Sequence, residues 1–233
     1  MENYGYIRDN LLALREEIDA LGSSVGREIT LVAVTKSGSD EELLALARLG
    51  ISDIGENRPQ ELKRRGELLS ALENKPRLHE IGNLQKNKVK LIIDCVSLIH
   101  SLDSLSLAKE IDRQAKLRGI TVPVLIEINS AGENAKGGID PGEAEEFLLA
   151  LREYGNISVR GLMTMGPVCE NPEDIRPYFR LCAKLYEELK TKHGFDGEGI
   201  LSMGMSDSYR QAIEEGATLV RVGRRLFEKR KEN

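Results

Sequence analysis

The chain has 233 residues, of which 40% are hydrophobic and 30% are charged, and its net charge at pH 7 is −5. This composition is ordinary for a globular protein of one large domain or two small ones. The acidic balance gives no electrostatic support for nucleic-acid binding, and no apolar run approaches the roughly 20 residues that cross a bilayer. The three cysteines have neither disulfide nor zinc-ligand spacing, so we expect no disulfide, no metal and a reducing, cytoplasmic location.

Apolar, strand-like segments alternate with amphipathic, helical segments from residue 29 onwards, and an extra helix over residues 4–21 precedes them. The expected strands are residues 29–35, 52–55, 77–81, 97–100, 121–128, 159–163, 200–202 and 218–222. The expected helices between them are residues 40–49, 59–72, 84–92, 104–118, 141–154, 172–193 and 208–215.

Strands that alternate with helices predict a parallel sheet, which makes the chain an α/β protein. Eight such units in a chain of this length predict a closed (β/α)8 (TIM) barrel. No linker rich in Pro, Gly or Ser divides the chain, so we expect a single domain over residues 1–233. An open, doubly wound sheet is the alternative, because three of the expected strands are short. The sequence lacks the GxGxxG and GxxxxGK[ST] motifs, which disfavours dinucleotide and P-loop sites.

Lys36 directly follows the first apolar strand, at the end of a barrel strand where functional groups lie. We expect its stem to lie along the barrel mouth with the amine partly dehydrated, because desolvation favours the neutral amine that attacks an aldehyde. The alternative, which is commoner for an arbitrary lysine, is a side chain that extends into solvent.

The segment over residues 200–223 predicts a phosphate site, since Ser206 and Gly223 follow the last two strands. As alternatives, Ser206 fits a helix N-cap and Gly223 a tight turn. With Lys36, a phosphate site at this end of the barrel suggests pyridoxal phosphate held as a Schiff base. If Arg221 points into the barrel, it can donate a hydrogen bond to the pyridine nitrogen; otherwise it is a structural arginine in an ion pair.

Eight motifs, in this order, carry a family resemblance. They are LVAVTK (31–36), GENRPQE (55–61), HEIGNLQKNK (79–88), HSLDS (100–104), INSAGENAKGG (128–138), GLMTMGP (161–167), LSMGMS (201–206) and VRVG (220–223). On these motifs the chain resembles, nearly end to end, the pyridoxal phosphate homeostasis proteins, whose fold is that of the barrel domain of alanine racemase.

The resemblance implies a Schiff base on one lysine, a phosphate site at the last two turns and an arginine that faces the pyridine nitrogen. The implied cofactor-binding residues are Lys36, Asn57, His79, Met203, Ser206, Arg221, Gly223 and Arg224. The family pattern usually has a small pair where Arg224 and Arg225 stand, a glycine at Glu228, an aspartate at Ser208 and a second lysine near Gly38. Members are thought to buffer pyridoxal phosphate and to supply it to pyridoxal phosphate-dependent apo-enzymes.

Three functions compete: a pyridoxal phosphate carrier without robust catalysis, a racemase-like enzyme that uses the same cofactor, and a barrel enzyme that acts on a phosphorylated metabolite. The alanine racemases take a second base, a tyrosine, from a further β-domain, and few residues follow the last expected strand here. We therefore expect a monomeric carrier that is not an enzyme, with weak side activity at most. Lys136, in a glycine-rich loop, is a second amine that we expect to be solvated.

Overall fold

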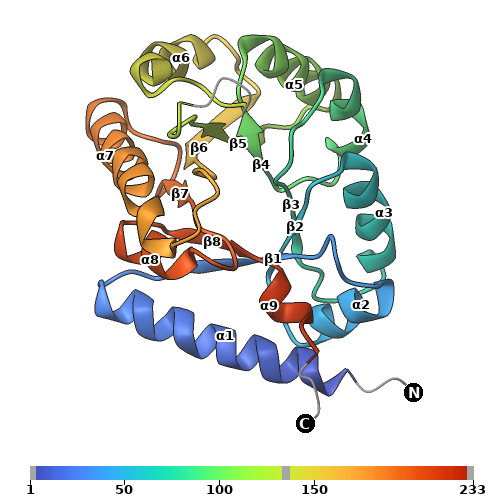
Figure 1. Ribbon diagram of the computed structural model, residues 1–233. Helices are drawn as coiled ribbons and strands as arrows, with labels where there is room; N and C mark the ends of the chain where they lie inside the picture. Colours follow the sequence, from blue (N-terminus) through green and yellow to red (C-terminus); the bar gives the residue numbers. More distant parts are fainter. Residues whose placement is uncertain (1–3, 133–136, 230–233) are drawn as a thin grey trace.

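A computed structural model describes residues 4–132 and 137–229, in which eight parallel strands close into a barrel (Figure 1). The strands are β1 (Thr30–Val34), β2 (Asp53–Glu56), β3 (Arg77–Glu80), β4 (Leu98–Leu102), β5 (Val122–Glu127), β6 (Ile157–Met163), β7 (Ile200–Ser202) and β8 (Leu219–Val222). They pair in chain order, and β8 closes the barrel against β1. The predicted (β/α)8 barrel is confirmed, and the doubly wound alternative is wrong.

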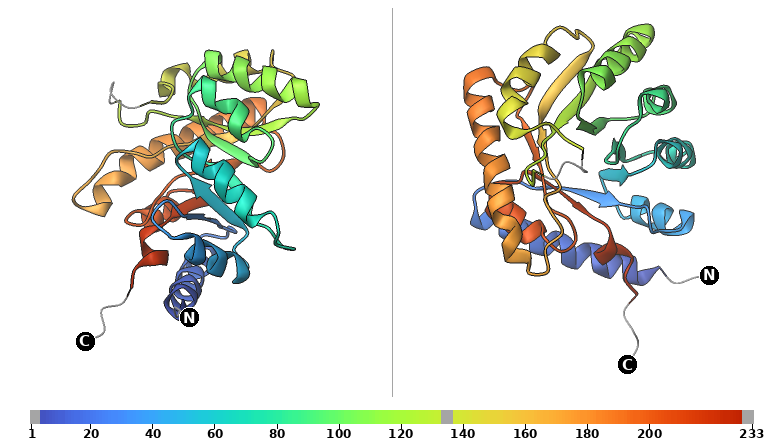
Figure 2. Two further views of the ribbon diagram at one scale, coloured as in Figure 1. Left: turned by 90° about the vertical axis from the view of Figure 1, so that its right-hand side faces the viewer. Right: turned by 45° about the horizontal axis from the view of Figure 1, so that its top comes forward.

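Helices surround the barrel on its outside (Figures 1 and 2). They are α1 (Gly5–Ser24), α2 (Asp40–Arg48), α3 (Pro59–Leu69), α4 (Val89–Ile92), α5 (Leu105–Arg118), α6 (Ala144–Leu151), α7 (Arg176–His193), α8 (Tyr209–Glu214) and α9 (Arg224–Phe227), with short 3-10 turns η1 (Lys86–Lys88), η2 (Pro141–Glu143) and η3 (Pro172–Ile175). The expected helices 84–92, 141–154 and 172–193 each begin with one of these 3-10 turns, and α9 was not expected from the sequence.

Local signals in the sequence set several of the helix ends. Ser39 and Glu42 form a capping box at the start of α2, and Ser104 caps α5. Gly119 follows α5 with a φ of 64°, a left-handed conformation that glycine adopts without a steric penalty. At α8 the sequence expectation needs correction, because the N-cap residue is Ser208 and not Ser206.

The barrel has two apolar regions. The larger one lies between the outward faces of the strands and the helices, where side chains such as Ile54, Ile126 and Phe179 are buried. The smaller one fills part of the barrel interior and consists of Leu98, Leu125 and Met163. Polar side chains occupy much of the remaining interior, which distinguishes this barrel from one filled only by branched apolar residues.

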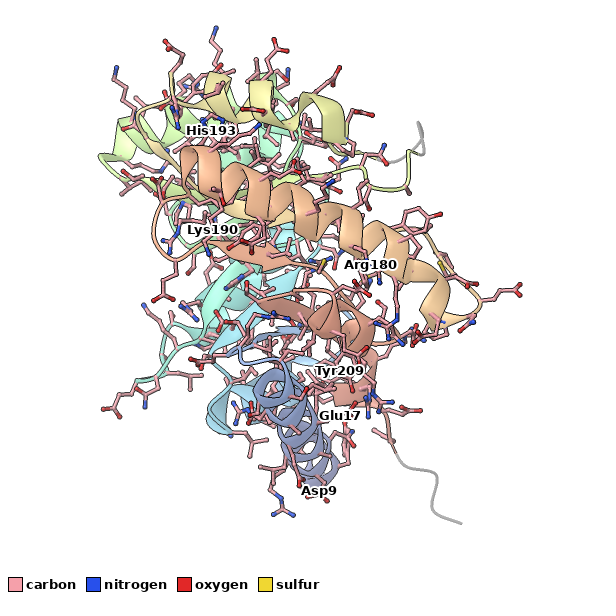
Figure 3. The ribbon with its side chains drawn as sticks, turned by 90° about the vertical axis from the view of Figure 1, so that its left-hand side faces the viewer. Asp9, Glu17, Arg180, Lys190, His193 and Tyr209 are labelled. Carbon is pink, nitrogen blue, oxygen red and sulfur yellow. The ribbon has the colours of Figure 1, made fainter. Side chains whose placement is uncertain are left out.

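Helix α1 packs along α8, α9 and α2, outside the barrel (Figure 1). Its buried stripe, Ile7, Leu11, Leu14 and Ile18, has the spacing of one helical face. The Tyr209 hydroxyl donates a hydrogen bond of 2.5 Å to Glu17 on α1 (Figure 3). A membrane-spanning helix is not found within residues 4–132 and 137–229, and neither is a group of side chains that could hold a metal ion.

Candidate functional site

The turns that follow β1 and β8 lie side by side at the C-terminal mouth of the barrel. Ala33 is in register with Val222, so Lys36 and Gly223 emerge from neighbouring strands. A Cβ atom at Gly223 would lie 2.8 Å from the carbonyl oxygen of Val34, which is closer than real Cβ contacts. Only glycine therefore permits this approach of the two backbones.

Ser206 belongs to the same mouth, because its hydroxyl oxygen accepts a hydrogen bond of 3.2 Å from the backbone N–H of Gly223. That contact leaves the hydroxyl hydrogen of Ser206 available as a donor. The neighbouring residues Asp207 and Arg224 form an ion pair on the surface. The loop after β7 and the turn after β8 are thus joined by a hydrogen bond and by an ion pair.

Arg224 and Arg225 have different partners. The exposed side chain of Arg224 pairs with Asp207, and Arg225 contacts the hydroxyl of Tyr209 and lies 3.2 Å from Glu17. Arg225 therefore joins α9 to α8 and α1, a structural role that the sequence did not indicate.

Lys36 lines a cavity of about 470 Å³. The other lining residues are Ser37, Glu56, Asn57, Arg58, Glu61 and Arg65. Lys36 itself is exposed, and a partly dehydrated amine stays a prediction. Asn57 has the opposite character: its side-chain oxygen Oδ1 is buried and has no hydrogen-bond partner among the described residues.

Buried polar residues fix the backbone on either side of Lys36. Arg65, on the inner face of α3, donates hydrogen bonds to the carbonyl oxygens of Thr35, at 2.7 Å, and Gly38, at 3.0 Å. It also lies 2.9 Å from Glu56, whose pKa is raised by burial although the Thr35 hydroxyl and Arg65 act in the opposite direction. Sequence reasoning missed Arg65; its only signal is a charged residue in the buried stripe of α3 with Leu62 and Leu69.

Arg221 points into the barrel, as one of the two sequence alternatives expected. Its guanidinium donates to the Ser202 hydroxyl, at 2.5 Å, and to the carbonyl oxygen of Thr164, at 3.1 Å. Burial lowers the pKa of Arg221 to about 10, so the group stays charged at neutral pH. Glu127 also lies in the mouth, where burial and then Asp103 raise its pKa to about 7.

Of the eight predicted cofactor-binding residues, all of them described in the structure, Lys36 and Asn57 line the Lys36 cavity and the other six do not. Met203 is fully buried in the large outer core, and His79 lies in the barrel interior, where its ring bonds to Asp53 and His100. For both, a contact with a cofactor stays a prediction. Lys136 lies outside the described residues.

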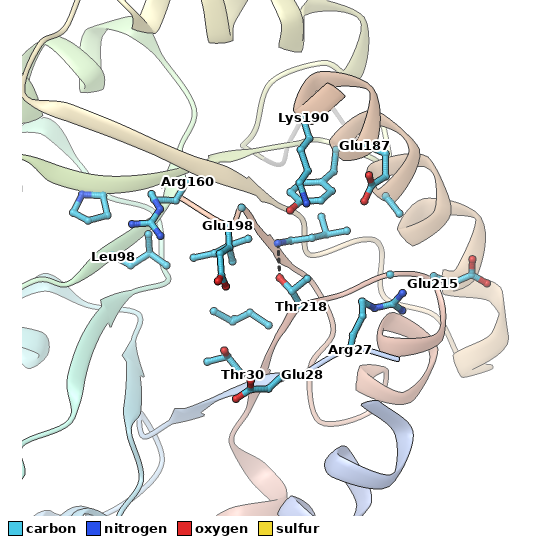
Figure 4. A pocket seen from close by; sticks show the side chains of 18 of the residues that line it. Arg27, Glu28, Thr30, Leu98, Arg160, Glu187, Lys190, Glu198, Glu215 and Thr218 are labelled. Carbon is cyan, nitrogen blue, oxygen red and sulfur yellow. Dashed lines mark hydrogen bonds between the residues drawn. The ribbon is translucent and has the colours of Figure 1, made fainter. Parts of the chain in front are cut away.

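A second cavity, of about 870 Å³, opens at the opposite end of the barrel, where the strands begin (Figure 4). Arg27, Arg160 and Glu198 are among its lining residues, together with Asp53 and His79. The Nε atoms of Arg27 and Arg160 are buried without a hydrogen-bond partner among the described residues. Because His79 lines this cavity, the interior polar residues extend from the N-terminal end of the barrel towards Arg221.

The C-terminal mouth therefore combines an exposed amine, a hydroxyl donor and a charged arginine on neighbouring strand ends. Such a set can bind an anionic group at Ser206 and Gly223 and can offer the Lys36 amine to a carbonyl carbon of the same ligand. A phosphorylated aldehyde has both groups.

Comparisons with known proteins agree on one family. The family model of the alanine racemase N-terminal domain matches residues 10–230. The pyridoxal phosphate homeostasis protein of Aquifex aeolicus is 44% identical over 201 residues, which cover 86% of this chain and 87% of the relative. The protein of the same name from Escherichia coli K12 is 34% identical, with 95% of each chain covered.

Solved structures of similar fold extend these matches. PipY from Synechococcus elongatus PCC7942, in a structure with PLP bound, has a TM-score of 0.83 and 28% identity and covers 95% of this chain and 100% of that one. Alanine racemase from Clostridium difficile 630, in complex with cycloserine, has a TM-score of 0.78 at 16% identity, covering 98% of this chain and 61% of that one. The second likeness shows the fold alone.

Proposed function

Since this chain belongs to the family of pyridoxal phosphate homeostasis proteins, we propose that it binds pyridoxal phosphate covalently through Lys36 at the C-terminal mouth of the barrel and acts in the homeostasis and supply of this cofactor. The proposal is carried by one observation: the turn with Lys36 packs against the turn with Gly223, whose N–H is bonded to the Ser206 hydroxyl.

The residues at the mouth fit this cofactor. Gly223 lets the turn after β8 lie against the turn with Lys36, and Ser206, which accepts from the Gly223 N–H, keeps its hydroxyl hydrogen for a phosphate oxygen. The buried amide oxygen of Asn57, in the lining of the Lys36 cavity, has no partner within residues 4–132 and 137–229, and a hydroxyl or amine donor on a ligand would satisfy it. Arg221 contributes a buried positive charge on β8, below the mouth.

When bound, pyridoxal phosphate supplies an aldehyde carbon for attachment to a lysine and a pyridine ring that withdraws electrons. Ser206 and the backbone of Gly223 and Arg224 would hold the phosphate. Arg65 and Glu56 fix the backbone around Lys36, so the amine leaves β1 in one direction. Arg221 would face the pyridine nitrogen and would leave it unprotonated, because a guanidinium at this pKa donates hydrogen bonds and does not give up a proton.

The proposal covers a carrier rather than a catalyst. The relatives are named homeostasis proteins, and the exposed position of Lys36 gives water access to the attachment site. We place the protein in the cytoplasm as a monomer that exchanges pyridoxal phosphate with apo-enzymes that depend on it.

Labelling tests the attachment site. After incubation with pyridoxal phosphate and reduction with borohydride, peptide mapping should find the cofactor on Lys36, and Lys36→Ala should lose both the visible absorbance and the adduct. Lys63→Ala is the matched control, since Lys63 is an exposed lysine on α3 paired with Glu67. A modified Lys136 with an unmodified Lys36 contradicts the assignment.

A further inference from the structure

A continuous chain of buried side chains crosses the barrel interior from Asp53 to Arg221. His79 Nε2 lies 2.9 Å from the Asp53 carboxylate, and His79 Nδ1 lies 2.9 Å from His100 Nε2. His100 Nδ1 lies 3.0 Å from the Ser202 hydroxyl, which accepts from Arg221. All five residues are buried, at 4% exposure or less.

The charged groups at the two ends of this row of side chains, Asp53 and Arg221, determine where the neighbouring hydrogen atoms lie. Burial on its own would raise the pKa of Asp53, but hydrogen bonds from His79 and Arg77 lower it below its usual range, so Asp53 is a carboxylate that only accepts. His79 Nε2 must therefore carry a hydrogen. Arg221 only donates, so the Ser202 oxygen accepts from it and the Ser202 hydroxyl hydrogen points elsewhere.

Two arrangements of the hydrogen atoms on His79, His100 and Ser202 remain. If His79 is neutral, its Nδ1 accepts from His100 Nε2–H, and His100 Nδ1 accepts from the Ser202 hydroxyl. If His79 is a cation, both His–His and His–Ser bonds reverse, and the Ser202 hydroxyl loses its acceptor; no other acceptor for it is found among the described residues. Burial holds the pKa of His100 well below its usual range and the charge of Arg221 acts in the same direction, so His100 is neutral in either case; a positive charge on His79 would lower this pKa further.

When both rings are neutral, each ring N–H and the Ser202 hydroxyl has an acceptor. Each group then donates towards the carboxylate: Arg221 to Ser202, Ser202 to His100, His100 to His79, and His79 to Asp53. Buried polar networks that are fully satisfied fix side-chain positions more firmly than partly satisfied ones.

We propose that His79 and His100 are positioning residues, both in the Nε2–H tautomer, which hold the Ser202 oxygen and through it the Arg221 guanidinium by a one-way hydrogen-bond chain anchored on Asp53. The inference rests on the proposed function, because these hydrogen-bonded side chains would orient Arg221 towards the pyridine nitrogen. It also explains why His79 lies away from the Lys36 cavity: it acts on the site through Arg221.

Arg77 strengthens the anchor from the N-terminal end. Its guanidinium contacts both oxygens of Asp53, at 2.7 and 2.8 Å, and lies on the wall of the second cavity (Figure 4 shows this cavity). Arg77 therefore contacts both carboxylate oxygens of Asp53, and Oδ1 is also bonded to His79.

The first test uses the protein without cofactor. The chain has three histidines, and 15N NMR of the imidazole rings reports their tautomers. We expect neutral Nε2–H rings for His79 and His100, with assignments from His79→Gln and His100→Gln. His193, which bonds to Glu145 near the surface, serves as the internal control. A doubly protonated ring or an Nδ1–H tautomer at either buried position overturns the proposal, whether or not the protein binds pyridoxal phosphate.

The second test measures the cofactor site. His100→Leu removes the hydrogen bonds to His79 and Ser202, so Arg221 is no longer held in place through Ser202. We expect pyridoxal phosphate binding to weaken about tenfold, which corresponds to about 1.4 kcal/mol, and the absorbance of the bound cofactor to shift. His100→Gln keeps a donor and an acceptor and should restore most of the affinity, and His193→Gln should match the unmodified protein.

Unchanged affinity and absorbance in a folded His100→Leu protein overturn the positioning role. If His100→Leu does not fold, the comparison of His100→Gln with the unmodified protein and the NMR tautomers decide. A failure of the proposed function looks different, because Lys36 then remains unlabelled in the unmodified protein as well.

Discussion

Glu80 is a buried carboxyl group whose burial makes the stability of the protein depend on pH. It is fully buried at the end of β3; Oε1 accepts a hydrogen bond of 3.1 Å from the Gly82 N–H, and Oε2 has no partner among the described residues. Burial raises the pKa of Glu80 from 4.5 to about 8 although the Gly82 hydrogen bond opposes the change. The folded protein therefore holds a proton on Glu80 at neutral pH.

This proton makes stability depend on pH. Between about pH 4.5 and 8 the folded chain binds a proton that the unfolded chain releases, so the free energy of unfolding should fall as pH rises, by up to about 1.4 kcal/mol per pH unit. Glu80→Gln keeps the acceptor for Gly82 and should remove this part of the slope, as measured by urea unfolding at several pH values. Glu73→Gln, at an exposed position, is the control; equal slopes in the two variants would contradict the prediction.

Helix α1 is the element that the barrel does not need for closure, yet it contributes a full apolar stripe. Leu14 is 1% exposed in that stripe, whereas Leu12, two residues earlier, is 56% exposed. Leu14→Ala should lower the free energy of unfolding by about 2–5 kcal/mol, because it removes buried methyl groups and leaves a cavity. Leu12→Ala should change it by about 0.5 kcal/mol or less. Denaturant unfolding of both variants checks this, and similar losses would show that α1 does not pack as described.

At the scale of the whole molecule, the barrel is that of the alanine racemases, but Lys36 is exposed at its mouth. A site open to water loses orientation and electrostatic strength, so we expect alanine to be racemised far more slowly than about 1 s⁻¹, the lower end of ordinary turnover numbers. A polarimetric or coupled assay of the cofactor-loaded protein measures this rate. Turnover at or above that value would defeat the proposal of a carrier and favour the racemase-like alternative.

The sequence predicted the alternation of strands and helices because hydrophobic periodicity and capping residues act over a few neighbouring positions. Expected and observed strands agree to within two residues at each end, and β7 (Ile200–Ser202) agrees at both ends. The order of the strands then followed from the alternation, and with it the placement of Lys36, Ser206 and Gly223 at one mouth.

Contacts between distant positions were decided only by the tertiary structure. His100 and Ser202 are 102 positions apart, Arg65 and Thr35 are 30 apart, and Tyr209 and Glu17 are 192 apart. No local sequence pattern relates such residues. They come into contact only when the barrel closes, because the register of the strands decides which inward-facing side chains lie at the same level. For the same reason the sequence did not indicate that His79 belongs to a row of hydrogen-bonded, buried side chains that ends at Arg221.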